Sequence, residues 1–312
     1  MAGLLQRLGL KTVLILLIKL CLSAAFFYWI WTALPDGTNW MELDLVQPVL
    51  LAVCIVAVLL QVALLAFRWL ITTRHIASGI DDLPALRFLR FFHLTWLSLA
   101  ISQVLPALVG GDGFRIAGLR YDGVPLGTST KSVIIDRIFG LAGLVVLIIP
   151  GAAMSGFFAF LPFWVFPGAA LLAGAIAAGL LIARRSLARI VFFHGGWLKQ
   201  ITGTGGLALL VMAIAGHAVS ILIFQLLANA YGIDIPVSTT LAVFPAALLM
   251  SILPISFGGW GVREASVVYG LSLYGVPEHD ALIASLIFGS FQICAAIPSI
   301  VGLFSWARRI QE

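Results

Sequence analysis

Two copies of a glycine-rich motif carry the residues best suited to hold an anion. The pattern LPxxxGGxGxR occurs at Leu105–Arg115 and again at Leu253–Arg263. Proline ends a helix and glycines permit a tight turn, so a new helix is expected just after each turn. The free N–H groups and positive dipole end of that helix attract anions, and the arginine adds a forked donor for phosphate or carboxylate. Each motif therefore predicts an anion-binding corner.

Residues in and around the motifs are the candidates for substrate binding. Asp112 can pair with Arg115 across one helical turn, or with Arg137. Asp136 and Arg137 either neutralise each other near the inner surface or face the interior, where intramembrane charges are functional candidates. The candidate residues are Gly110, Gly111, Asp112, Arg115, Asp136, Arg137, Gly258, Gly259, Gly261, Arg263 and Glu264.

Both motif arginines also have a purely structural interpretation. Arg115 is expected at the inner edge of the membrane, where its side chain could snorkel to headgroups. Arg263 is expected on the outer half, against the usual distribution of positive charge, so a functional role is favoured there. The glycines could simply turn the chain.

Other polar side chains in apolar segments have simpler interpretations. Lys19 and Arg68 are expected to snorkel to the inner face. His93 and His217 are each expected to form a hydrogen bond between helices. The three cysteines are scattered singly, which predicts neither a disulfide framework nor a zinc site, and enzyme motifs are missing. We expect no enzyme activity, no cofactor and no metal.

The composition indicates a membrane protein. Hydrophobic residues make up 62% of the 312 residues and charged residues 10%, with a mean hydropathy of +1.11. A soluble domain has about 25% charged residues, so a water-soluble globule is excluded. The fold class expected is an all-α polytopic membrane protein.

Six apolar stretches are long enough to cross a bilayer, which takes about 20 residues. Two more, at about 88–115 and 238–276, are expected to enter the membrane and return as re-entrant hairpins. The six crossings are expected at about 12–34, 45–67, 132–154, 162–183, 207–229 and 281–307.

Loop charge predicts the orientation. With the N-terminus inside and both hairpins re-entrant, fourteen of the 18 Lys and Arg residues fall in inside loops. This agrees with the positive-inside rule and places both termini in the cytoplasm. The formal charge of +5 is therefore not read as nucleic-acid binding.

The repeated motif divides the chain into two halves, 1–158 and 159–312. Each half is expected to contain two spans, a re-entrant hairpin and a further span. Because three crossings separate the two motifs, the second half is expected to be inverted relative to the first. In transporters built from inverted repeats, the substrate site lies near the midplane, where broken helices meet.

The segments LPALVGGDGFR, SVIIDR and LPISFGGWGVREA together resemble the flippase-like membrane domain of lysylphosphatidylglycerol synthases, the multiple peptide resistance factor family. The resemblance implies a lipid-handling protein with two inverted halves and re-entrant elements. It carries Pro106 and Pro254 over as motif positions, together with the candidate residues above. The chain ends at Glu312 without the aminoacyl-transfer domain of those synthases, so the lipid itself stays open.

The expected function is translocation, by flipping or scrambling, of an anionic phospholipid or related lipid in a bacterial inner membrane. The alternative is a membrane scaffold that presents lipid to a separate synthase or glycosyltransferase. An intramembrane enzyme acting on a lipid phosphate is a third hypothesis. The expected partners are membrane lipids with anionic headgroups; a lipid-modifying enzyme and a second copy of the chain are further candidates, and nucleic acid is not.

Overall fold

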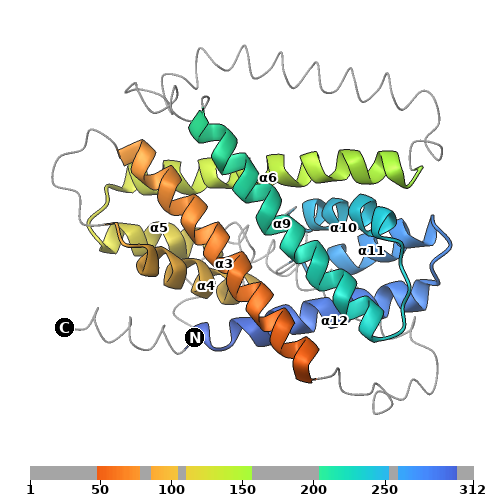
Figure 1. The fold of residues 1–312 in the computed structure, drawn as a ribbon. Helices are drawn as coiled ribbons and strands as arrows, with labels where there is room; N and C mark the ends of the chain where they lie inside the picture. Colours follow the sequence, from red (N-terminus) through yellow and green to blue (C-terminus); the bar gives the residue numbers. More distant parts are fainter. Residues whose placement is uncertain (1–47, 78–85, 105–109, 157–203, 253–258, 301–312) are drawn as a thin grey trace, which may run out of the picture.

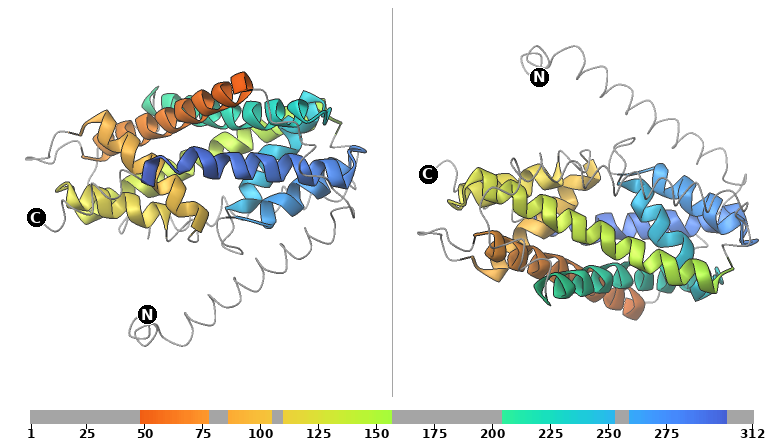
Figure 2. Two further views of the ribbon diagram at one scale, coloured as in Figure 1. Left: turned by 90° about the horizontal axis from the view of Figure 1, so that it is seen from below. Right: turned by 90° about the horizontal axis from the view of Figure 1, so that it is seen from above.

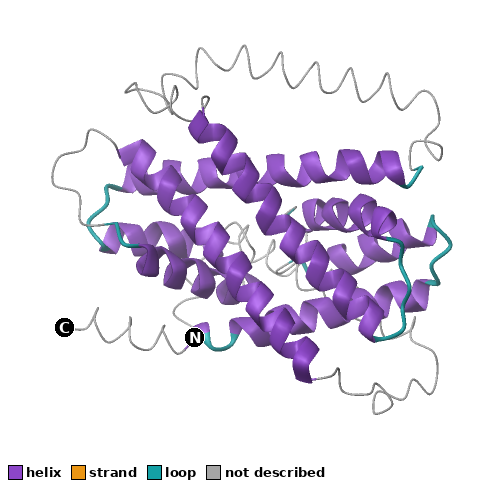
Figure 3. Ribbon diagram, viewed as in Figure 1, coloured by secondary structure: helices purple, strands orange, loops and turns teal. Residues whose placement is uncertain are grey.

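The computed structural model describes residues 48–77, 86–104, 110–156, 204–252 and 259–300. These residues form eight helices and no strand (Figure 3). The helices are α3 (Pro48–Ala77), α4 (Phe88–Val104), α5 (Gly111–Tyr121), α6 (Leu126–Met154), α9 (Thr204–Ala230), α10 (Val237–Ser251), α11 (Val262–Ser272) and α12 (Glu278–Ala296).

Four of these helices, α3, α6, α9 and α12, are long and apolar enough to cross a membrane. They confirm that the chain is an all-α polytopic membrane protein, and they coincide with the spans expected at 45–67, 132–154, 207–229 and 281–307. The spans expected at 12–34 and 162–183 lie outside the described residues.

Two of the helices extend beyond the expected spans at their charged ends. α3 continues to Ala77, ten residues beyond its expected end at 67, and α6 begins at Leu126 rather than at 132. Arg68, the first charge beyond the expected end of the second span, does not meet water, because it is buried against Asp136 between the two helices. A charged residue that is paired inside the protein gives no reason for the helix to stop.

The order of helices repeats along the chain. A long helix, two short helices and a long helix, α3–α6, are followed by the same order in α9–α12. α5 and α11 have 11 residues each, about 16 Å of helix against a hydrocarbon core of about 30 Å. The short pairs α4–α5 and α10–α11 fall where the re-entrant hairpins are expected. Re-entry into the membrane and inversion of the halves stay predictions.

The two short pairs lie at opposite ends of the molecule, with α3 and α9 packed side by side between them (Figures 1 and 2). α6 packs against α5 of its own half and extends to α10 of the other half. α12 packs against α11 and extends back to α4, where Trp96 Nε1 donates a hydrogen bond of 2.9 Å to the carbonyl oxygen of Ala295. Each half thus ends in a helix that supports the short pair of the other half.

Aromatic side chains fill the larger core, in the second half. Phe224 of α9 stacks on Phe244 of α10 with ring centroids 4.2 Å apart, and Phe288 of α12 meets Phe244 edge-on at 4.9 Å. All three rings are at most 3% exposed, so burial and ring geometry together stabilise this contact. A smaller core around Trp69 and Phe91 lies in the first half, beside the site described next.

Candidate functional site

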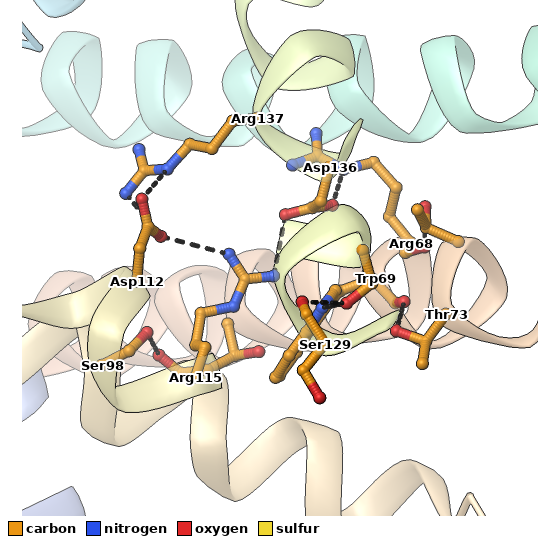
Figure 4. A network of polar contacts seen from close by, with 12 residues as sticks. Arg68, Trp69, Thr73, Ser98, Asp112, Arg115, Ser129, Asp136 and Arg137 are labelled. Atoms are coloured by element: carbon orange, nitrogen blue, oxygen red, sulfur yellow. Dashed lines mark hydrogen bonds and ion pairs between the residues drawn. The ribbon is translucent and has the colours of Figure 1, made fainter. Parts of the chain in front are cut away.

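A row of five alternating charges, four of them buried, lies in the first half and is contributed by α3, α5 and α6 (Figure 4). We call it the ionic row; in order it consists of Arg68, Asp136, Arg115, Asp112 and Arg137. Asp136 accepts from Arg68 Nε at 2.7 Å and from Arg115 Nη2 at 2.8 Å. Arg115 Nη1 lies 3.7 Å from Asp112 Oδ1. Arg137 completes the row with two hydrogen bonds to Asp112, of 2.8 and 3.0 Å.

Burial makes this row energetically demanding. Arg68, Asp112, Arg115 and Asp136 are 4%, 6%, 5% and 1% exposed. Desolvated charges are tolerated only when they are paired, and each carboxylate here serves two guanidinium groups. Three arginines face two aspartates, so the row has a net formal charge of +1.

The indole ring of Trp69, the residue after Arg68, packs against the ionic row. The Arg115 guanidinium carbon lies 4.0 Å from the centroid of the indole ring, a cation–π contact. Trp69 Nε1 donates to Ser132 Oγ at 3.1 Å, which fixes the ring between α3 and α6. Arg115 is therefore held by a ring on one side and by carboxylates at its tip.

The helix expected just after the glycine turn is present in both halves, but α5 begins at Gly111, inside the motif, whereas α11 begins at Val262, beyond the last motif glycine. Gly111 packs directly on α4. A Cβ atom at Gly111 would collide with the Ser102 side chain and lie 2.8 Å from the carbonyl oxygen of Ser98. Only glycine lets the turn approach α4 this closely, and this approach sets the position of Asp112 and Arg115 on the next helical turn.

The pairing of Asp112 is confirmed in both expected forms, with Arg115 and with Arg137. The suggestion that Asp136 and Arg137 neutralise each other is wrong. Asp136 faces Arg68 and Arg115, whereas Arg137 reaches Asp112.

Arg68 is the site residue that the sequence reasoning missed. Its expected snorkelling is wrong, because the side chain is buried and bonded to Asp136. The signal was present in the sequence: the apolar pattern continues past Arg68 with Trp69, Leu70 and Ile71, so the charge lies within a helix and not at its end.

A second cluster lies at the start of α11, and we call it the glutamate corner: Gly261, Arg263 and Glu264. Arg263 donates from Nε, at 3.0 Å, and from Nη2 to one oxygen of Glu264. The other oxygen accepts from the backbone N–H of Gly261 at 2.6 Å. Glu264 is fully buried and Arg263 is 8% exposed.

Positive φ angles of 78° at Gly259 and 82° at Gly261 form the turn before the glutamate corner, as the motif predicts. The Arg263 guanidinium lies 4.8 Å from the Trp260 ring centroid and 5.6 Å from that of Phe288. Trp260 therefore stacks on the Arg263 guanidinium group. Gly258 and the two motif prolines, Pro106 and Pro254, lie outside the described residues.

A glycine faces a buried guanidinium group in each half. A Cβ atom at Gly140 of α6 would lie 3.4 Å from Arg68 Nη2, and one at Gly289 of α12 would collide with Arg263 Nη2. The two glycines belong to the repeated tripeptide Ile-Phe-Gly. In both halves the repeated glycine therefore leaves space for a guanidinium group. The arginine comes from α3 in the first half and from α11 in the second.

The two histidines differ. His217 of α9 makes the expected hydrogen bond between helices, from Nε2 to the Gly140 carbonyl oxygen at 3.0 Å. The expectation is wrong for His93, whose Nδ1 contacts the carbonyl of Leu89 in its own helix at 2.8 Å. A histidine ring nitrogen can form its hydrogen bond with the carbonyl oxygen four residues earlier in the same helix, so it needs no partner on another helix.

The structure thus brings the candidate residues together in two separate clusters, one in each half. None of the ion pairs among the described residues joins the ionic row to the glutamate corner. Arg115 and Arg263 occupy equivalent motif positions, and each is buried, stacked on a tryptophan and bonded to a carboxylate.

A family model described as the lysylphosphatidylglycerol synthase TM region matches residues 16–302, nearly the whole chain. The match confirms the resemblance inferred from the three sequence segments. No curated protein matches the chain.

Proposed function

The chain belongs to the family of the lysylphosphatidylglycerol synthase transmembrane region, and from this we propose that it moves an anionic phospholipid or related lipid between membrane leaflets. The family is tied to lipid metabolism or translocation in membranes. The observation that carries the proposal is the ionic row, a buried set of charges with a positive excess inside an apolar helical protein.

Charges in this position require an explanation. Placing a charged side chain at the centre of a membrane helix costs about 2.5–3.5 kcal/mol on insertion scales. Five such side chains gathered by three helices would be an expensive way to hold helices together, since apolar packing would serve equally well. An anionic headgroup crossing the bilayer needs a polar, positively charged place on its path, and the ionic row supplies one.

The arrangement of the helices supports movement rather than passive anchoring. Two units of similar helix order, each supporting the short pair of the other, are typical of transporters in which one repeat rocks against the other. Under the proposal the halves are inverted, and the pairs α4–α5 and α10–α11 enter from opposite sides as re-entrant elements.

The proposal also covers the membrane in which the protein lies and the energy source for lipid transfer. The protein is a multi-pass membrane protein, and we assign it to a bacterial inner membrane with both termini in the cytoplasm. Transfer would be driven by an ion gradient, by the membrane potential or by removal of the product. Asp112, Asp136 and Glu264 are the candidate groups for coupling to protons.

Reconstitution into liposomes tests the proposal. Liposomes carry a fluorescent phosphatidylglycerol, and a membrane-impermeant quencher added outside reports the lipid that reaches the outer leaflet. We expect transfer with the protein and a rate reduced at least tenfold in Arg115→Gln. Arg120→Gln is the control, because it removes the same charge from the exposed face of the same helix.

Two results would contradict the proposal. Transfer no faster than in empty liposomes would favour the scaffold hypothesis, which predicts binding without movement. A change in the chemical structure of the lipid, seen by mass spectrometry, would favour the enzyme hypothesis.

A further inference from the structure

The two anion-binding corners are not equivalent, and the difference concerns one atom. Arg263 Nε donates to Glu264 at 3.0 Å. Arg115 Nε, the same atom on the repeat-equivalent arginine, is buried and has no hydrogen-bond partner among the described residues. A buried N–H without an acceptor is energetically costly, so this position calls for an oxygen atom.

The sequence explains the difference. The residue after Arg263 is Glu264, and the residue after Arg115 is Ile116. In the second half the glutamate places a carboxylate against the arginine and the backbone N–H of Gly261. In the first half an apolar side chain occupies the equivalent position, so the residue after the arginine supplies no carboxylate there.

The backbone at the first corner also differs from that at the second. α5 starts one turn earlier than α11 in the repeat alignment. Both N-cap residues are glycines without a side-chain cap, but the N–H of Gly261 is bonded to Glu264, and no described carboxylate is bonded to Gly110 or to the first turn of α5. Gly113, the counterpart of Gly261, lies in this first helical turn, whose N–H groups have no intrahelical acceptor. A Cβ atom at Gly113 would meet no atom of the described residues within 4 Å.

The net charges of the two clusters also favour anion binding in the first half. Arg263 and Glu264 neutralise each other, whereas the ionic row has a net charge of +1. Arg137, at its end, is the one member with a substantially exposed side chain, at 36%. An anion that approached beside Arg137 would find one uncompensated positive charge.

From these four differences we infer that the first-half corner is the site for the ligand's oxyanion, bound by Arg115 Nε, the first turn of α5 and Arg137. Glu264 is the built-in anion that permanently fills the equivalent corner of the second half. The inference rests on the proposed function for its choice of a lipid headgroup. The charge balance further assigns a group with one negative charge, such as a phosphodiester, in preference to a phosphomonoester, which carries about −1.5 to −2 at pH 7.

The decisive variant copies the second half into the first. Ile116→Glu should place a carboxylate where the ligand binds, and Ile116→Gln is the matched neutral control. Binding is measured with the full-length protein in detergent, by titration with dihexanoyl phosphatidylglycerol. We expect affinity to fall at least tenfold in Ile116→Glu and to stay within threefold of wild type in Ile116→Gln.

A second pair of variants covers the case in which position 116 does not tolerate either change. Arg137→Gln should also weaken binding at least tenfold, whereas Arg120→Gln should leave it unchanged. A single peak in size-exclusion chromatography verifies that each variant is folded. If folded Ile116→Glu or folded Arg137→Gln binds with wild-type affinity, the inference is overturned.

Further probes distinguish the ligand's source and charge. Inorganic phosphate at millimolar concentration should not compete, if a lipid headgroup rather than free phosphate is the ligand; full competition would reassign the site to the free ion. Dihexanoyl phosphatidic acid should bind more weakly than phosphatidylglycerol in the wild type, and Asp112→Asn, which raises the net charge to +2, should reverse that preference. An unchanged preference would overturn the charge assignment.

These titrations do not depend on transport. Liposome transfer together with unaltered binding in the variants would contradict the inference alone. Selective binding at the first corner without any transfer would contradict the proposed function and leave the inference standing.

Discussion

At the scale of single residues, Asp136 is the centre of the ionic row. It is 1% exposed and accepts hydrogen bonds from Arg68 of α3 and Arg115 of α5. Removing its charge would leave two buried guanidinium groups without their main acceptor. Loss of one partner from a buried ion pair is far more damaging than the pair is stabilising, because the remaining charge stays desolvated.

We therefore predict that Asp136→Asn lowers the free energy of unfolding by about 3–5 kcal/mol. The measurement is equilibrium unfolding in detergent, followed by circular dichroism. The size of the effect reflects the burial of the pair and not the number of hydrogen bonds lost.

Asp122→Asn is the matched control for this prediction. Asp122 makes a two-pronged pair with Arg90, but the two side chains are 25% and 31% exposed. Partly hydrated pairs contribute about 0–1 kcal/mol, so a small effect is expected. Equal losses in the two variants would show that burial does not determine the strength of the ionic row.

At the scale of helices, α6 determines how the halves meet. It carries Asp136 and Arg137 to the ionic row, and its C-terminal part packs on α10 of the other half. The approach is close at Gly151, where an added Cβ atom would lie 2.5 Å from the backbone nitrogen of Ala242. Backbone atoms cannot move aside as a flexible side chain can, so this contact depends on glycine.

Gly151→Ala is predicted to lower the melting temperature by several degrees and to weaken transfer between leaflets, because α6 must move away from α10. A loss of about 1–3 kcal/mol is typical when a packed contact is overfilled. Thermal unfolding in detergent and the liposome measurement check the two effects.

Gly127→Ala provides the comparison within the same helix. A Cβ atom at Gly127 would meet no atom of the described residues within 4 Å, and alanine favours a helix over glycine by up to about 1 kcal/mol. The variant should therefore be as stable as wild type or slightly more stable. If Gly151→Ala behaves in the same way, α6 and α10 are not held at contact distance.

At the scale of the whole molecule, the arrangement of the halves allows a test of inversion. α6 and α12 begin directly after a repeated Gly-Val-Pro turn, at Leu126 and Glu278, and both residues are exposed. In inverted repeats these equivalent positions lie on opposite sides of the membrane.

Single cysteines at the two positions should react with a membrane-impermeant maleimide from opposite sides. Leu126→Cys is expected to be labelled from the cytoplasm and Glu278→Cys from outside, in a background in which Cys21, Cys54 and Cys294 are replaced. Labelling of both from the same side would mean that the halves are parallel, and the proposed rocking mechanism would lose its basis.

Much of the architecture follows from the sequence. The membrane environment, four of the spans and the helix start after the second glycine turn follow from apolar run length and from the backbone preferences of glycine and proline, which act locally. The internal repeat is visible because identical residues recur at a constant spacing. These features depend on interactions within a few residues of each other, so no knowledge of the packing is needed.

The partners of the charges were decided by the tertiary structure. From the sequence, the apolar pattern that continues past Arg68 places this residue within a helix but does not identify its partner, and Asp136 was as close to Arg137 as to any other cation. Only the packing of α3 against α5 and α6 places Arg68 and Arg115 on either side of Asp136. The energy of a charge inside a membrane depends on the groups within a few ångströms of it, and those groups lie 68 and 21 residues away along the chain.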